Sequence, residues 1–164
     1  MSKSKTPTSF FVPCQDQGSR LTIILYSIMM KVAICLAAHA NSGKSTSLKM
    51  LGHLLTGKEC SECEIKQIFD YKGVKVGITS SGDTLDYLKP GFDELIAAEC
   101  NFLVYACRTK GTAANYAYNK AKAMGYKIIR MGTAYDYSHS IQEICNKHIA
   151  GAIKETIDTI IELQ

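Results

Sequence analysis

Apolar and polar residues alternate along this chain in blocks that predict strands and helices in turn. Short apolar runs rich in β-branched and aromatic residues predict strands over residues 31–38, 65–71, 74–79, 102–107 and 127–131. Apolar residues at helical spacing predict helices over residues 44–56, 84–96, 112–124 and 138–163. The predicted order of elements is therefore β-α-β-β-α-β-α-β-α.

This order is typical of a three-layer α/β fold with a doubly wound, mainly parallel sheet. The two-residue connection Lys72-Gly73 joins two of the strands and predicts a hairpin, which supplies one antiparallel strand. The continuous apolar run at residues 102–107 predicts a central parallel strand. Because right-handed crossovers bring the carboxyl ends of parallel strands to one edge, we expect the ligand at that edge.

Glycine, proline and isoleucine positions refine the predicted helices. Gly57 and Gly125 predict the ends of two helices, and Pro90-Gly91 predicts a kink or division of another. The last helix carries an isoleucine stripe on one face, made of Ile141, Ile144, Ile149, Ile153, Ile157, Ile160 and Ile161. Core packing is the favoured interpretation of this stripe. A homodimer contact through the outer end of the C-terminal helix is the alternative.

The first predicted strand runs into a polar turn and a helix, with the sequence AHANSGKS at the turn. This sequence matches the phosphate-loop pattern G-x-x-x-x-G-K-[ST], except that Ala38 replaces the first glycine. Successive backbone N–H groups and the helix N-terminus can converge on phosphate oxygens there. Lys44 is placed to reach the terminal phosphates, and the Ser45 hydroxyl to meet Mg²⁺. The predicted binding residues are Asn41, Ser42, Gly43, Lys44, Ser45 and Thr46.

This strand, loop and helix resemble the Walker A motif of P-loop nucleotide-binding proteins. The resemblance implies a P-loop NTPase-like fold that uses ATP and Mg²⁺ as cofactors. It covers residues 31–137, is specific at residues 43–45 and indicates no single family within the superfamily. The alternative is a chance junction of loop and helix in which Ser42 is an ordinary N-cap.

The sequence offers no obvious carboxylate to bind Mg²⁺ or to act as a base in phosphoryl transfer. The strand at residues 102–107 ends without an acid, so it lacks the usual Walker B residue. The strand at residues 74–79 runs into Ser80-Ser81-Gly82-Asp83, and its place resembles that of the GTPase strand that ends in D-x-x-G. Asp83 is therefore predicted to contact Mg²⁺ through water or to act as a base. Its alternative role is a helix N-cap.

Basic and aromatic residues follow the later strands. Arg108 and Lys110 come just after the central strand, where either can neutralise phosphate charge, or where they form an ordinary exposed pair. The segment Arg108-Thr109-Lys110-Gly111 lacks the acid of the guanine-reading N-K-x-D motif, so guanine specificity is not expected. Tyr135 or Tyr137 is a candidate to stack on a base. His39 is expected to face solvent or substrate.

Composition supports one domain and adds little to the choice of ligand. Hydrophobic residues make up 46% and charged residues 21% of the 164 residues. The net charge of +4 is modest and spread along the chain, so it gives no clear signal for nucleic acid. Seven cysteines, an odd number, indicate reduced thiols and a cytoplasmic location. Cys60 and Cys63 form a C-x-x-C sequence, for which a turn with two free thiols is favoured over a zinc-binding site or a redox-active pair.

Residues 1–30 are predicted to be an N-terminal extension, and residues 31–164 a single nucleotide-binding domain. The apolar run at residues 21–38 approaches the length of a membrane span, but its second half is needed as the first strand. Met29 and Met30 come directly before that strand and suggest a natural start there. No membrane association is therefore predicted.

Two functions remain open from the residues. The first is an ATP-dependent kinase or NTPase in which Lys44, Asp83 and Arg108 are catalytic and Ser45 and Asp83 hold Mg²⁺. Its partner is a nucleoside triphosphate, together with an unknown small-molecule acceptor if it is a kinase. The second is a catalytically degenerate nucleotide sensor or a partner-binding module, which Ala38 and the missing strand-end acid favour.

Overall fold

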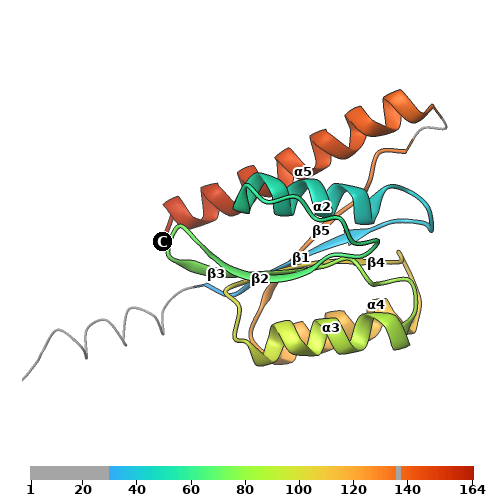
Figure 1. Ribbon diagram of the computed structural model, residues 1–164. Coiled ribbons are helices and arrows are strands. Elements are labelled where there is room, and N and C mark those ends of the chain that lie inside the picture. The colour runs from blue at the N-terminus through green and yellow to red at the C-terminus, as the bar shows by residue number, and fades with distance from the viewer. Residues whose placement is uncertain (1–29, 136–137) are drawn as a thin grey trace, which may run out of the picture.

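The computed structural model describes residues 30–135 and 138–164 (Figure 1). The predicted extension, apart from Met30, lies outside the described residues. The strands are β1 Val32–Ala37, β2 Lys66–Tyr71, β3 Val74–Thr79, β4 Phe102–Cys107 and β5 Lys127–Met131. The helices are α2 Lys44–Thr56, α3 Leu85–Ala97, α4 Thr112–Ala123 and α5 His139–Glu162. The predicted order of elements is confirmed.

The strands form one mixed sheet in the order β2-β3-β4-β1-β5. β3, β4, β1 and β5 are parallel, and β2 pairs antiparallel with β3 across the predicted hairpin. The α/β class and the mainly parallel sheet with one antiparallel pair are therefore confirmed. β4 lies between β1 and β3, so β3 is not a direct neighbour of the strand that leads into the predicted phosphate loop.

Helices cover both faces of the sheet, with α2 and α5 on one side and α3 and α4 on the other (Figure 1). Ile34, Leu48 and Ile153 belong to the first core layer, and Phe92 and Ala117 to the second. β1 and β4 are buried along their whole length, which explains why their sequences are apolar without alternation.

The predicted division of α3 at Pro90-Gly91 is wrong, because α3 is one continuous helix with Pro90 inside it. A kink at this position stays a prediction. Pro90 is exposed, whereas Leu88 and Phe92 on either side of it are fully buried against the sheet. Burial of two large side chains outweighs the single backbone hydrogen bond that proline cannot make. The predicted end of α2 is confirmed, since Gly57 caps that helix in the left-handed conformation.

The isoleucine stripe of α5 divides into two parts. Ile149, Ile153 and Ile157 are buried in the core, as the favoured interpretation predicts. Ile141 and Ile144 are 48% and 66% exposed, because the first turns of α5 extend beyond the sheet (Figure 1). The homodimer contact through this outer end stays a prediction.

No helix within residues 30–135 and 138–164 combines the length and the apolar character needed to cross a bilayer. The second half of the apolar run at residues 21–38 forms β1, as predicted.

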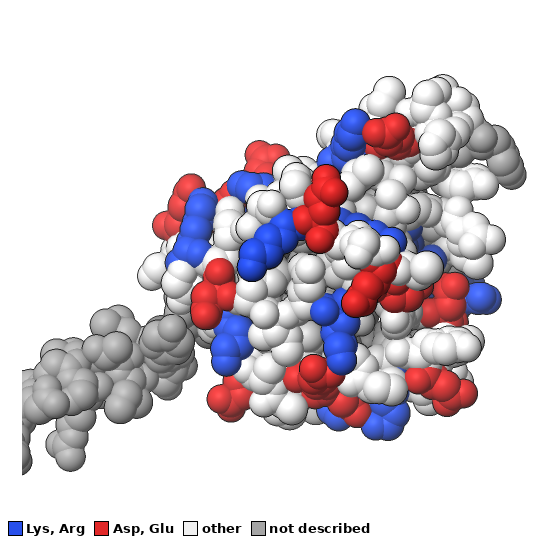
Figure 2. Space-filling model, in the orientation of Figure 1, with Lys and Arg blue, Asp and Glu red and all other residues white. Residues whose placement is uncertain are grey.

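Charged side chains of both signs are interspersed over the face of the molecule shown in Figure 2. One cluster joins α3 to α4, where Asp93 accepts hydrogen bonds from Lys89, Lys120 and Tyr116 at 2.6–2.8 Å. Partial burial raises the pKa of Asp93, but these three donors outweigh it and lower the pKa to about 2.

A second cluster joins the β2–β3 hairpin to α5. Asp158 accepts hydrogen bonds from Tyr71 at 2.8 Å and Lys154 at 2.5 Å, and its carboxylate lies 2.9 Å from the Lys72 ammonium. Partial burial again raises the pKa of this carboxyl, and the donors outweigh it and lower the pKa to about 2.

These two carboxylates should make the fold sensitive to acid. A carboxyl whose pKa is lower in the folded state contributes stability above its unfolded pKa, and this stability is lost as the pH falls through the folded pKa. We expect Asp93→Asn and Asp158→Asn each to lower the free energy of unfolding by roughly 1 kcal/mol at pH 7, after allowance for solvent screening. Urea unfolding between pH 7 and pH 2 should show the difference from wild type vanishing at the acid end. A difference that is constant with pH would contradict this prediction.

Candidate functional site

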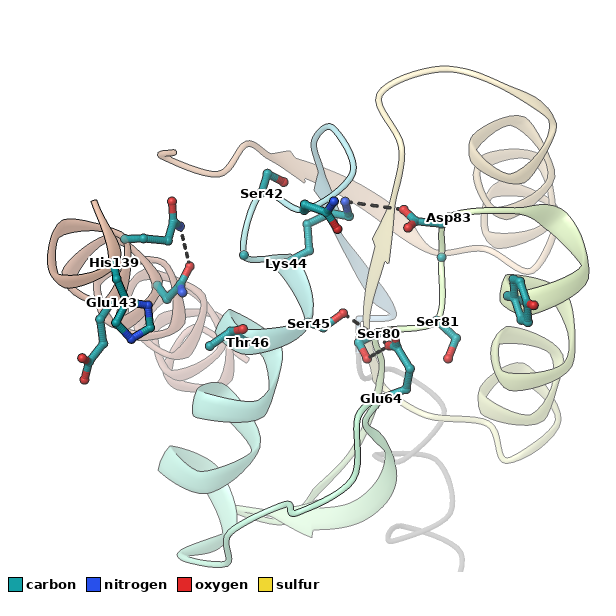
Figure 3. Close-up of a pocket in the computed structure, with 16 residues that line it drawn as sticks. Ser42, Lys44, Ser45, Thr46, Glu64, Ser80, Ser81, Asp83, His139 and Glu143 are labelled. Atoms are coloured by element: carbon teal, nitrogen blue, oxygen red, sulfur yellow. Dashed lines mark hydrogen bonds and ion pairs between the residues drawn. The ribbon is translucent and has the colours of Figure 1, made fainter. Parts of the chain in front are cut away.

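A cavity of about 650 Å³ opens beside the carboxyl ends of β1 and β3 (Figure 3). The phosphate loop and the start of α2 form one side, the segment after β3 faces them, and the first turns of α5 close a third side. The lining residues are Asn41, Ser42, Gly43, Lys44, Ser45, Thr46, Glu64, Ser80, Ser81, Gly82, Asp83, Tyr87, His139, Gln142, Glu143 and Asn146. All six predicted phosphate-binding residues therefore lie on one cavity at the predicted edge of the sheet.

The loop has the backbone conformation of a tight turn into a helix. Asn41 and Gly43 have positive φ angles of 57° and 79°, and α2 begins immediately after Gly43. The first backbone N–H groups of a helix have no carbonyl in a preceding turn to pair with, so they are available to an anion. Ser42 is not the N-cap, because Gly43 occupies that position and the Ser42 hydroxyl donates to the His39 carbonyl at 2.8 Å.

The side chain of Lys44 folds back over its own loop and is only 6% exposed. Its ammonium donates to the His39 carbonyl at 2.5 Å and to the Ala38 carbonyl at 3.4 Å. The Lys44 Nζ also lies 3.7 Å from the Asp83 carboxylate (Figure 3). A buried cation is thus held at the cavity by neutral carbonyls and one half-exposed acid.

Asp83 lies between two cations. Its Oδ1 atom is 3.7 Å from Lys44 Nζ and 3.7 Å from Arg108 Nε, so the structure brings the three predicted catalytic residues together. Asp83 is not the helix cap, because Thr84 occupies the N-cap position of α3. The segment that carries Asp83 packs closely against β4, and only glycine fits at position 82. A Cβ atom there would lie 1.8 Å from the Ala106 carbonyl oxygen of β4.

Glu64 is the carboxylate that sequence reasoning missed. The Ser45 hydroxyl donates to its Oε2 atom at 3.3 Å, and the Ser80 hydroxyl donates to the same oxygen. Ser80 is buried, and its hydroxyl also accepts the Ile65 N–H at 2.9 Å. The start of β2 and the end of β3 therefore hold the Glu64 carboxylate beside Ser45, the residue predicted to bind Mg²⁺ (Figure 3).

The sequence did contain a signal for Glu64. The hairpin turns at Lys72-Gly73 and pairs Lys66 with Thr79. Continuing this antiparallel register by two residues places Glu64 opposite Ser81, in the segment that carries Asp83. Counting back from the turn would therefore have brought Glu64 to the phosphate edge.

The oxygen atoms of Ser45 and Glu64 suit a hard cation such as Mg²⁺ if a bound phosphate supplies some of the other coordinating oxygens. Within the described residues, no group of three or more His, Cys, Asp or Glu side chains could hold a metal ion by itself. One hydroxyl and one carboxylate, from Ser45 and Glu64, are what Mg²⁺ uses when phosphates and waters supply its other ligands. The predicted metal role of Asp83 has less support, because that carboxylate faces the cations of Lys44 and Arg108.

α5 contributes polar groups to the far side of the loop. The Asn146 Oδ1 atom accepts hydrogen bonds from Ser47 at 3.3 Å and from Gln142 at 2.9 Å. A Cβ atom on Gly43 would lie 2.2 Å from that oxygen. The positive φ favours glycine at position 43, and a larger residue would also displace the Asn146 side chain of α5.

Other predicted contacts lie outside the cavity. Tyr135 is 51% exposed and is not one of the lining residues, and Tyr137 lies outside the described residues. The tyrosine that lines the cavity is Tyr87 of α3, which is 71% exposed. His39 is exposed, as expected, and Lys110 is an exposed loop residue away from the lining.

The sequence matches no protein-family model, and no curated protein matches it.

Proposed function

We propose that this chain is a phosphoryl-transfer enzyme of the P-loop type, which binds ATP with Mg²⁺ and passes the terminal phosphoryl group to water or to a small acceptor. The observation that carries the proposal is the convergence of Lys44, Ser45 and Glu64 on one cavity at the N-terminus of α2. The cavity volume of about 650 Å³ is in the range of small-molecule sites.

The loop supplies the binding. The N–H groups at the start of α2 and the partial positive charge of that helix end favour a polyphosphate. Lys44 exchanges its carbonyl partners for phosphate oxygens, which replaces neutral acceptors with charged ones and strengthens its hydrogen bonds. Bound Mg²⁺ supplies Lewis-acid stabilisation of the developing negative charge. Ser45 and Glu64 are the residues that would hold this ion.

Asp83 and Arg108 act at the other end of the phosphate chain. Arg108 is half exposed and can turn toward a terminal phosphoryl group, where a guanidinium stabilises the charge of the transition state. This movement frees the Asp83 carboxylate from one of its two cations. Asp83 then orients the attacking oxygen and accepts its proton.

A nucleotide sensor is the second candidate. Asp83 is paired with both Lys44 and Arg108, and β4 ends in Cys107 without an acid. A carboxylate held in this way competes with phosphate for the two cations. The sensor binds nucleotide without turnover.

Calorimetric titration with a non-hydrolysable ATP analogue, with Mg²⁺ and with EDTA, tests the proposal. We expect saturable binding that is several-fold tighter with Mg²⁺. The absence of binding under both conditions would refute the proposed function. Phosphate release from ATP then separates the enzyme from the sensor.

Glu64→Gln should lower turnover far more than binding, because the amide keeps the shape of the side chain but loses the charge that holds Mg²⁺. We expect kcat to fall by about 100-fold, in line with the loss of one preorganised electrostatic contact. Glu62→Gln is the matched control, since Glu62 is an exposed acid in the same segment and does not line the cavity. Equal activity of the Glu64 variant and wild type would contradict the assignment, and Asp83→Ala would then test the other acid.

A further inference from the structure

Two buried thiols lie side by side near the carboxyl ends of β1 and β4. Cys35 of β1 and Cys107 of β4 have their sulfur atoms 3.0 Å apart. The parallel register pairs Cys35 with Tyr105 and Ala37 with Cys107, so the two cysteines lie diagonally on neighbouring strands. Both face the layer formed by α3 and α4.

The thiol pair has a route to solvent. A separate cavity of about 210 Å³ is lined by Cys35, Cys107 and Tyr105 together with the exposed Tyr118 and Arg130. Cys35 is only 3% exposed and Cys107 only 1% exposed, but a small molecule can reach their sulfur atoms through this cavity.

The surroundings distinguish the two sulfurs. The hydrogen bond with Cys107 lowers the pKa of Cys35, burial opposes this effect, and a hydrogen bond with Tyr105 and the nearby Arg130 charge add to the lowering. The same hydrogen bond and burial raise the pKa of Cys107. The lowered pKa favours Cys35 as the thiol that attacks, and the 3.0 Å separation places Cys107 within reach to resolve it.

We propose that Cys35 and Cys107 form a reversible redox site that a small hydroperoxide oxidises to a disulfide. The Cys35 thiol loses its proton and its thiolate attacks the peroxide, the O–O bond breaks, and the leaving oxygen takes up a proton and departs as an alcohol, or as water from hydrogen peroxide, while Cys35 becomes a sulfenic acid. The Cys107 sulfur then attacks the Cys35 sulfur, and the hydroxyl group leaves as water with the Cys107 proton. Two thiols lose two electrons to the peroxide, and a dithiol reductant reverses the change.

The disulfide acts on the phosphate site through the backbone. The Cys107 carbonyl accepts the Ala38 N–H at 3.2 Å, and the Ala38 carbonyl accepts from Lys44. Arg108 follows Cys107 directly. Forming the bond shortens the sulfur separation from 3.0 Å to about 2.05 Å, which draws the ends of β1 and β4 together by up to about 1 Å. Oxidation therefore displaces Lys44 and Arg108, an effect that rests on the proposed function.

The test is a titration of the full chain with hydrogen peroxide or cumene hydroperoxide, followed by alkylation, intact mass measurement and mapping of cross-linked peptides. We expect loss of two hydrogen atoms and a peptide that links Cys35 to Cys107, both reversed by dithiothreitol. Affinity for the Mg²⁺ complex of the ATP analogue should fall about 5- to 150-fold in the oxidised chain, the usual range of coupling between two sites.

Three variants serve as controls. Cys35→Ser and Cys107→Ser should lose the cross-link, and Cys63→Ser, which removes an exposed thiol, should keep it. Mapping of cross-linked peptides from the wild-type chain shows whether Cys35 and Cys107 form the disulfide, even if a variant of these buried residues fails to fold. Oxidation of Cys63 without a link between Cys35 and Cys107 would overturn the proposal, and a link that leaves affinity unchanged would overturn the coupling. Absence of nucleotide binding in both redox states would instead refute the proposed function.

Discussion

Lys44→Ala should abolish nucleotide binding at concentrations that saturate the wild type. The side chain supplies the buried cation of the cavity, and its loss leaves a polyphosphate facing loop amides alone. Charge-assisted hydrogen bonds contribute about 1.5–3 kcal/mol each, so we expect affinity to fall by about 100-fold or more. Titration with the ATP analogue and Mg²⁺ measures this loss.

Lys49→Ala is the matched control for Lys44→Ala. Lys49 lies on the same helix α2, but it lines a different surface cavity and does not line the phosphate site. Its removal changes the net charge equally and should leave affinity within about twofold, since a half-buried charge outside the site is screened by solvent and makes no contact with the phosphates. Equal losses in the two variants would show that general electrostatic attraction, rather than the Lys44 ammonium, holds the phosphates.

Gly82→Ala should cause the largest loss of stability among single substitutions at the site. The added Cβ would lie 1.8 Å from the carbonyl oxygen and 2.5 Å from the carbonyl carbon of Ala106, and both atoms belong to the backbone of the central strand. Neither the strand nor the segment after β3 can move without disturbing buried Ser80 or the core around β4. We expect the free energy of unfolding to fall by about 3 kcal/mol or more, measured by urea unfolding.

The same substitution should also impair the site, because Asp83 follows Gly82 and would be displaced from Lys44 and Arg108. Gly132→Ala is the control, since a Cβ atom there meets nothing within 4 Å and its backbone has no positive φ. This control should change stability by less than about 0.5 kcal/mol. Similar stabilities for Gly82→Ala and wild type would contradict the close approach that brings Asp83 over β4.

Features that depend on neighbouring residues were predicted well. The end of α2 at Gly57, the hairpin at Lys72-Gly73 and the two-sided burial of β4 all follow from turn chemistry and hydrophobic period. The strand, turn and helix around residues 38–46 were predicted for the same reason, because they are consecutive in the chain, and the phosphate role of this loop stays a prediction. Asp83 and Arg108 were brought to one edge by chain order alone, since each follows the carboxyl end of a parallel strand.

The errors and omissions concern contacts between distant segments. The predicted division of the helix at Pro90 is wrong because a local sequence pattern does not include the burial of Leu88 and Phe92, which favours one continuous α3. The place of β4 between β1 and β3 could not be read from the strands, because parallel neighbours are joined by crossovers and share no turn.

The sequence by itself therefore determined the succession of strands and helices and the edge of the sheet at which the loop after β1 lines a cavity. Only the tertiary structure decided that Glu64 meets Ser45, that Asn146 of α5 closes on Gly43 and that Cys35 contacts Cys107. The physical reason is that local conformation depends on residues within one turn or one strand. Side-chain contacts across the molecule depend instead on strand order, register and the packing of whole layers.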